Sequence, residues 1–236
     1  MPHPTAGYRL PDGSKVVGTT TVLGRFKESG GLLWWACQMG QKYPALPVRE
    51  ALYGERDTAA DIGSCVHSMV ETHTNGEDAS EVFKAFNDKT LDAQAAEKVW
   101  SGFNAYLAWE RMTRLEITHQ ELQLVCPVYR FGGTPDAIGL IDGEPCLLDW
   151  KTSKSVYPDM LIQLAAYGYL CEHGLQQERD YQPLGIKVRG YHLCKFSKEH
   201  GDFSHHYYPD LSEGWEQFKR YLECYETDKI LKARAA

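Results

Sequence analysis

The pattern of apolar and polar residues divides the chain into helical stretches towards both ends and a strand-rich segment between them. Helices are predicted where apolar residues share one face and where capping or turn residues mark the ends. They are expected at 57–74 with Asp57 or Thr58 as N-terminal cap and Gly76 past the end, at 91–112, at 159–173 closed by Gly174, and at 211–233. A further helix is expected in the apolar run from Leu32 to Ala36.

The composition of the central segment predicts strands. Residues 121–152, ELQLVCPVYRFGGTPDAIGLIDGEPCLLDWKT, combine β-branched and apolar residues with Gly-Gly and Asp-Gly turn signals. Two more strands are expected at 184–196 and 202–208, and a short hairpin in YRLPDGSKVVG turns at Asp12-Gly13. Helices around a block of strands predict an α/β fold, in which helices flank the strands and the N-terminal part is a helical elaboration. We expect a single domain over 1–236, made of the elaboration (1–56), the core (57–208) and a C-terminal helix (209–236).

One predicted turn places two carboxylates opposite each other. Asp142-Gly143 is the preferred dipeptide of a two-residue type I′ hairpin turn. Counting outward from this turn brings Asp136 opposite Asp149, with Cβ atoms about 4.5–5.5 Å apart. Facing carboxylates repel each other, and each raises the pKa of the other unless a cation intervenes.

Lys151 shares a strand face with Asp149, because side chains alternate along a strand. One lysine balances one carboxylate, whereas a divalent ion balances both and also binds backbone carbonyls and substrate phosphates. We therefore predict a Mg²⁺ or Mn²⁺ site formed by Asp136, Asp149 and the backbone carbonyl of Trp150. Lys151 would orient the nucleophile or neutralise charge developing on a phosphodiester. The alternative is an exposed hairpin whose acids face water and whose lysine forms a surface ion pair.

Composition narrows the class of protein. The 236 residues include 43% hydrophobic residues, enough for one core, and no apolar run reaches the length of a membrane span. The net charge of −7 argues mildly against binding of nucleic acid. Acidic residues that hold a metal, however, lower the net charge without repelling DNA from other parts of the surface. Seven scattered cysteines without a C-x-x-C element favour reduced thiols in a cytoplasmic protein and argue against an iron–sulfur cluster.

Pro135-Asp136 followed by Asp149-Trp150-Lys151 resembles the motif of the PD-(D/E)XK nuclease superfamily. The resemblance implies that the two acids hold a metal, that the lysine assists catalysis, and that a mixed four-stranded sheet flanked by helices forms the core. Residues 63–71, GSCVHSMVE, are similar to the G-x-x-x-H-x-x-x-E helix of the RecB-like branch, and Gln163 with Tyr167 matches its Q-x-x-x-Y element. The opening TTTVLGRF resembles phage-encoded exonucleases and the mitochondrial genome-maintenance exonuclease.

This resemblance implies roles for residues outside the hairpin. His67 would approach the metal from its helix, with Glu71 on the same helical face, and Glu121 would be the acid that this branch often carries before the first strand. Gln163 and Tyr167 would contact DNA near the scissile phosphate. The alternatives without a role in the site are that His67 is a structural histidine and Glu121 a surface glutamate. Gln163 and Tyr167 would then be a buried amide and ring in an amphipathic helix. Basic residues expected to support DNA binding are Lys154, Lys187 and Arg189.

Together these features predict a Mg²⁺- or Mn²⁺-dependent DNA exonuclease that acts on single strands or processed ends in replication, recombination or repair. If the protein is phage-encoded, it would act in the host cytoplasm. Aromatic rings on which bases could stack, unless they pack the N-terminal helices on the core, are those of Trp34, Trp35, Tyr43 and Tyr53. The alternatives are a DNA endonuclease on the same core and a non-catalytic DNA-binding module, although a module that only binds DNA has no need of facing acids.

Overall fold

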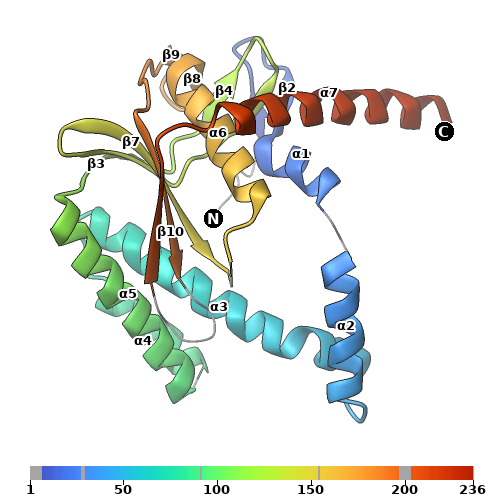
Figure 1. The fold of residues 1–236 in the computed structure, drawn as a ribbon, viewed down its shortest axis with the longest axis vertical. Helices are drawn as coiled ribbons and strands as arrows, with labels where there is room; N and C mark the ends of the chain where they lie inside the picture. Colours follow the sequence, from blue (N-terminus) through green and yellow to red (C-terminus); the bar gives the residue numbers. More distant parts are fainter. Residues whose placement is uncertain (1–6, 28–29, 91, 154, 197–202, 236) are drawn as a thin grey trace.

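The computed structural model describes residues 7–27, 30–90, 92–153, 155–196 and 203–235, with the backbone alone described at 30–32 and 53–60. It contains a five-stranded mixed sheet and a second sheet of six short strands, with helices on both faces of the five-stranded sheet (Figure 1). The predicted α/β fold, a mixed sheet flanked by helices with a helical N-terminal elaboration, is confirmed.

The five-stranded sheet carries the candidate site and has the order β11-β10-β7-β6-β3. Its strands are β3 (Glu116–Gln120), β6 (Ala137–Ile141), β7 (Glu144–Thr152), β10 (Gly190–Phe196) and β11 (Phe203–Tyr208). β7 and β10 run parallel and are connected through α6 (Pro158–His173), while the other neighbours are antiparallel. The sheet has one strand more than the four that the resemblance implied, because β11 folds back onto the edge of β10.

β6 and β7 form the hairpin that the Asp142-Gly143 turn predicts. Both turn residues have positive φ, 51° and 83°, as a type I′ turn requires. The ladder keeps the predicted register as far as the pair Ala137–Leu148, which are the neighbours of Asp136 and Asp149. The turn thus sets the relative position of the two acid-bearing segments.

A second sheet joins the N-terminal hairpin to the segment before Asp136. Its order is β1-β2-β5-β4-β8-β9. Its strands are β1 (Tyr8–Arg9), β2 (Lys15–Gly18), β4 (Leu124–Cys126), β5 (Phe131–Gly133), β8 (Leu175–Gln176) and β9 (Gln182–Pro183). The predicted hairpin at Asp12-Gly13 is confirmed as β1 and β2, and β2 runs parallel to β5. The sequence pattern missed the sheet because strands of two to four residues are too short to show a period.

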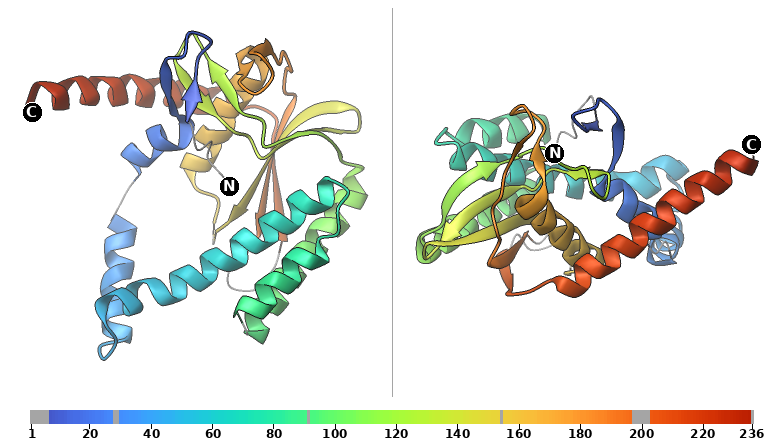
Figure 2. Two further views of the ribbon diagram at one scale, coloured as in Figure 1. Left: turned by 180° about the vertical axis from the view of Figure 1, so that it is seen from behind. Right: turned by 90° about the horizontal axis from the view of Figure 1, so that it is seen from above.

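Helices cover both faces of the five-stranded sheet (Figure 2). The described helices besides α6 are α1 (Thr19–Phe26), α2 (Gly30–Lys42), α3 (Val48–Thr74), α4 (Ser80–Thr90), α5 (Ala93–Thr113) and α7 (Ser212–Ala235). One core packs α3, α4 and α5 against Leu148 and Trp150 of β7. The other packs α1, α6 and α7 against Leu147 and Leu193. None of these described helices has the length and apolarity needed to cross a membrane.

The helix that carries His67 is longer than predicted. α3 begins at Val48 directly after Pro47, so Asp57 and Thr58 lie inside the helix and do not cap it. Proline fixes a φ that suits the entry into a helix, and no second proline interrupts the chain before its end. The helix ends at Thr74, as predicted. The expected division between residues 56 and 57 therefore falls within one continuous helix.

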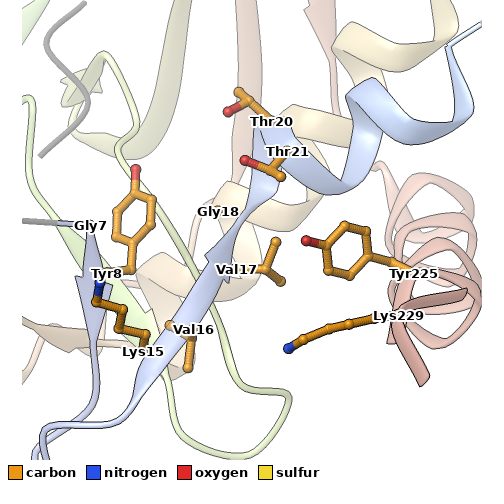
Figure 3. A pocket seen from close by; sticks show the side chains of 10 residues that line it. All are labelled: Gly7, Tyr8, Lys15, Val16, Val17, Gly18, Thr20, Thr21, Tyr225 and Lys229. Carbon is orange, nitrogen blue, oxygen red and sulfur yellow. The ribbon is translucent and has the colours of Figure 1, made fainter. Parts of the chain in front are cut away.

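A cavity of about 400 Å³ separates β2 from the C-terminal half of α7. Val17 of β2 and Tyr225 of α7 face each other across it (Figure 3). Nearby, the rings of Phe26 and Tyr221 stack with centroids 4.6 Å apart. α7 is thus held against α1 while leaving this gap beside the N-terminal hairpin.

Candidate active site

The hairpin of β6 and β7, which are inner strands of the five-stranded sheet, brings two buried carboxylates together. Asp136 immediately precedes β6 and is 1% exposed, while Asp149 lies within β7 and is 0% exposed. The backbone N–H of Trp150 donates a hydrogen bond of 2.7 Å to Oδ2 of Asp136. Lys151 Nζ lies 2.6 Å from Oδ2 of Asp149. The acids and the lysine therefore form one buried cluster, unlike the exposed hairpin that was the alternative.

Neither carboxylate is fully satisfied by this cluster. Oδ1 of Asp136 and Oδ1 of Asp149 are buried without a hydrogen-bond partner among the residues that the structure describes. Burial raises the pKa of Asp149 to about 7, with the nearby charge of Asp136 adding to it and Lys151 opposing it. Burial also acts to raise the pKa of Asp136, but the charges of His67 and Lys151 outweigh it and lower that pKa. Asp136 therefore loses its proton at a lower pH than Asp149.

His67 reaches the acids because α3 passes very close to the end of β7. A Cβ atom at Gly63 would overlap the side chain of Thr152, so only glycine allows this approach. One turn later, His67 Nε2 lies 3.6 Å from Oδ2 of Asp136 and 4.0 Å from Oε1 of Glu121. Both distances are too long for hydrogen bonds. Burial lowers the pKa of His67, but the two carboxylates outweigh it, and the net pKa is raised.

Glu121 lies beside Asp136 through strand pairing. Gln120 of β3 pairs with Ala137 of β6, so the next residue along β3 comes alongside Asp136. The backbone N–H of Glu121 donates to the carbonyl oxygen of Asp136 at 3.1 Å, and Glu121 has a positive φ of 47°. Burial, and then the charge of Asp136, raise the pKa of Glu121 to about 7. Glu121 was expected as an acid before the first strand; it instead follows β3, and its pairing with Asp136 brings it to the predicted ligands.

These groups fit a divalent cation. Nε2 of His67 and one carboxylate oxygen each of Glu121 and Asp136 lie within 4.8 Å of one another. Two ligand atoms at about 2.1 Å from one ion can be at most about 4.2 Å apart, close to the separations seen here. Nε2 of His67, Oε2 of Glu121 and Oδ1 of Asp136 lack hydrogen-bond partners within the described part of the chain. Buried polar atoms normally have partners, so an ion would satisfy atoms that the protein leaves open.

The cluster differs in part from the predicted ligand set. His67 and Asp136 belong to it, whereas Asp149 is turned towards Lys151. Trp150 contributes its backbone N–H to Asp136, and its carbonyl remains a predicted ligand. Glu71, four residues after His67 on α3, adds to the negative charge that raises the pKa of Glu121.

Gln163 and Tyr167 support the site from α6. Nε2 of Gln163 donates a hydrogen bond of 2.8 Å to the hydroxyl of Tyr167, and both side chains are buried. The ring of Tyr167 packs on Gly133, where a Cβ atom would overlap it. On the far side of the same segment, the hydroxyls of Tyr8 and Thr134 lie 2.9 Å apart. These contacts fix the backbone before Asp136, and the predicted contact of Gln163 and Tyr167 with DNA stays a prediction.

Lys187 and Arg189, two of the basic residues expected to support DNA binding, lie far from the cluster. The backbone N–H of Arg189 donates to Pro145 O at 2.8 Å, near the start of β7. At 3.3 Å per residue, this is about 20 Å along the strand from Lys151. Lys187 precedes Arg189 and is also exposed, while Lys154 lies outside the described residues. The placement of Lys187 and Arg189 does not bring them to the acids.

Residues 35–235 match the family model of the PD-(D/E)XK nuclease superfamily. The chain belongs to this superfamily. No curated protein matches the chain in sequence. The match covers the segments of this PD-(D/E)XK protein that carry His67, Glu121, Asp136, Asp149 and Lys151.

Several solved structures resemble this PD-(D/E)XK chain at low identity. The crystal structure of SSO0001 is 14% identical, with a TM-score of 0.32, covering 70% of this chain and 72% of that one. An alkaline exonuclease (LHK-Exo) from Laribacter hongkongensis is 14% identical, with a TM-score of 0.32, covering 56% of this chain and 71% of its own. The structure of LHK-Exo in complex with dAMP is 15% identical, with a TM-score of 0.32, covering 75% of this chain and 95% of that one.

Binding of a divalent ion to this PD-(D/E)XK protein should be at least about ten-fold tighter at pH 8 than at pH 5.5. Asp149 and Glu121, with pKa values raised to about 7, must lose protons before they can bind a cation. Isothermal titration calorimetry with Mn²⁺ across this range measures the change, and Glu121→Gln should flatten it. An affinity that does not vary with pH would show that these carboxylates are not ligands.

The same raised pKa values affect the metal-free fold in the opposite sense. A carboxylate whose pKa is higher in the folded protein stabilises the fold below its unfolded pKa of about 4 and loses that contribution as pH rises. For Asp149 and Glu121 the loss continues to about pH 7. Metal ions should therefore add most to the free energy of unfolding above that pH.

Proposed function

We propose that this chain is a divalent-metal-dependent DNA exonuclease that hydrolyses phosphodiester bonds from single-stranded or processed ends, in replication, recombination or repair. The observation that carries the proposal is the buried group of His67, Glu121 and Asp136, with unsatisfied ligand atoms, beside the Asp149–Lys151 pair. Membership of a nuclease superfamily supports the reaction class.

His67, Glu121 and Asp136 would hold the ion, and Asp149 would join them through the oxygen that faces away from Lys151. An imidazole ligand shifts the preference of a carboxylate site from Mg²⁺ towards a transition metal such as Mn²⁺. When bound, such an ion lowers the pKa of water and withdraws charge from phosphate oxygens. Hydrolysis then adds water across a P–O bond, leaving a phosphate on one product and a hydroxyl on the other.

Lys151 acts as a fixed ammonium group in this proposal. Burial lowers its pKa, but the carboxylates of Asp149 and Asp136 outweigh that effect and raise it. A lysine that stays protonated at neutral pH cannot accept a proton from water, so its role is to donate hydrogen bonds. Held by Asp149 Oδ2 at 2.6 Å, it would orient the attacking water or stabilise negative charge on the phosphate oxygens.

The preference for a single strand rests on exposed aromatic surface. Trp34 of α2 is 65% exposed, and α2 stands away from both sheets (Figure 1). A base stacked on such a ring contributes about 1–3 kcal/mol with little sequence preference. Trp35 and Tyr43 are half-buried, and the side chain of Tyr53 lies outside the described atoms. Trp34 is therefore the ring that fits this role best.

The test compares a linear single-stranded oligonucleotide with the same oligonucleotide closed into a circle, both with Mn²⁺ and with EDTA. An exonuclease degrades the linear strand, spares the circle and is inactive in EDTA. Cutting of the circle at a similar rate would support the endonuclease instead. Binding without any cutting would support the non-catalytic DNA-binding module. Asp149→Asn, prepared identically, excludes a contaminating nuclease.

A further inference from the structure

A second lysine lies next to Lys151 in the five-stranded sheet. β7 and β10 are parallel, and their register pairs Lys195 with Lys151 directly. Neighbouring strands are about 4.8 Å apart, so the two side chains start side by side. Both residues are half-buried at the carboxyl ends of their strands.

Strand alternation decides which face Lys195 occupies. Cys194 and Phe196 belong to the core under α3 and α5, whereas Leu193 belongs to the core under α6 and α7. Side chains two residues apart share a face, so Lys195 lies on the face of Leu193. On β7, Asp149 and Lys151 share that face, because Asp149 pairs with Leu193. Lys195 therefore extends the row of charged groups at the candidate active site.

The charges of the candidate active site indicate what a lysine at position 195 would do. With a divalent ion bound, the carboxylates of Glu121, Asp136 and Asp149 together with Lys151 would carry no net charge. A nucleic-acid strand brings one negative charge per phosphate, and a neutral site would not attract it. Lys195 presents a further ammonium group on the same face, directly beside Lys151.

We propose that Lys195 binds a non-scissile phosphate of the nucleic-acid strand, next to the phosphate that Lys151 approaches. Lys151 is held by Asp149 at 2.6 Å, and in the proposed function it would act on the reacting group. Lys195 is displaced from it by one strand along the sheet, which suits a neighbouring phosphate. This inference rests on the proposed function, because it names how the same site holds its substrate.

Lys84 is a control lysine on the other face of the five-stranded sheet. It is an exposed residue of α4, which packs into the core with α3 and α5. Removing it changes the net charge of the protein by the same amount. Any effect of Lys195 that depends on its position must therefore be absent from the Lys84 variant.

Lys195→Ala should raise KM for a linear single strand with Mn²⁺ about ten-fold and leave kcat within about two-fold. The slope of log(kcat/KM) against log[salt] should become shallower by about 0.7, as expected for one lost phosphate contact on a single strand. Lys195→Arg should restore most of KM, and Lys84→Ala should change neither KM nor the slope. Circular dichroism and the Tm check the fold, with Lys195→Gln as a second variant.

A strand with one neutral methylphosphonate linkage, moved stepwise past the cleavage position, identifies the phosphate. The wild type should bind one such strand about ten-fold more weakly, and Lys195→Ala should lose nothing further at that linkage. Wild-type KM and salt slope in Lys195→Ala, or equal losses in Lys84→Ala, would overturn the inference while cleavage by the wild type upholds the nuclease. If the wild type cleaves nothing, the nuclease proposal fails, and binding of the same strands by fluorescence anisotropy with Ca²⁺ still decides the role of Lys195.

Discussion

Asp149→Asn is expected to reduce single-turnover cleavage of a labelled single strand by more than about a thousand-fold. The carboxylate is fully buried, holds Lys151 through Oδ2 and keeps Oδ1 without a partner among the described residues. Asparagine has the same shape but no charge, so both the attraction for a cation and the orientation of the lysine are lost. The Mn²⁺-induced rise in Tm should disappear with the activity.

Asp142→Asn is the matched control for this variant. Asp142 lies on the same hairpin and is exposed, and its ion pair with Arg114 at 2.9 Å lies on the surface. Asparagine followed by glycine is equally suited to a type I′ turn, so the hairpin should keep its register. Cleavage should stay within about two-fold of the wild type. Normal cleavage by Asp149→Asn would show that the reaction occurs elsewhere in the protein.

Lys151→Ala is expected to reduce cleavage by about a thousand-fold or more while keeping the affinity for Mn²⁺. The lysine is not a ligand, and its removal frees Oδ2 of Asp149 from a 2.6 Å ion pair. Isothermal titration calorimetry should therefore find Mn²⁺ bound at least as tightly as in the wild type. This separates the variant from Asp149→Asn, which should lose both properties.

The free energy of unfolding, measured with and without Mn²⁺, is the control for Lys151→Ala. Removing one partner of a buried ion pair leaves the other charge without compensation and costs about 3–5 kcal/mol. In EDTA the free energy of unfolding should fall by about that amount, and Mn²⁺ should restore most of it, because the ion replaces the ammonium beside Asp149. Loss of both Mn²⁺ binding and the folded state would show instead that Lys151 is a structural residue.

The hairpin could be predicted because its information is local. Asp142-Gly143 determines a turn type, the turn determines the register, and the register places Asp136 near Asp149. The helix at 159–173 was predicted for the same kind of reason, since Gly174 ends it. Family resemblance added His67, whose approach depends on Gly63 on the same helix. The roles of these residues in catalysis remain predictions.

Features that depend on distant pairing could not be predicted in this way. Glu121 joins the cluster through the pairing of β3 with β6, which contains a shift in register between Ile117 and His119. Lys187 and Arg189 were expected to support DNA binding, and only the pairing of β10 with β7 tells that they lie at the opposite end of the strand from Lys151. The second sheet and α4 were missed as well, since short strands and a short helix carry little periodic signal.

The pairing of β2 with β5 has a consequence for the order in which the protein folds. Val17 pairs with Phe131, and the hydroxyls of Tyr8 and Thr134 meet across 126 positions of sequence. Closing so long a loop costs more entropy than closing the two-residue turn between β6 and β7. During synthesis β2 cannot pair with β5 until β5 has left the ribosome. The support that Tyr8 gives to the segment before Asp136 therefore comes from residues that are made long before that support can form.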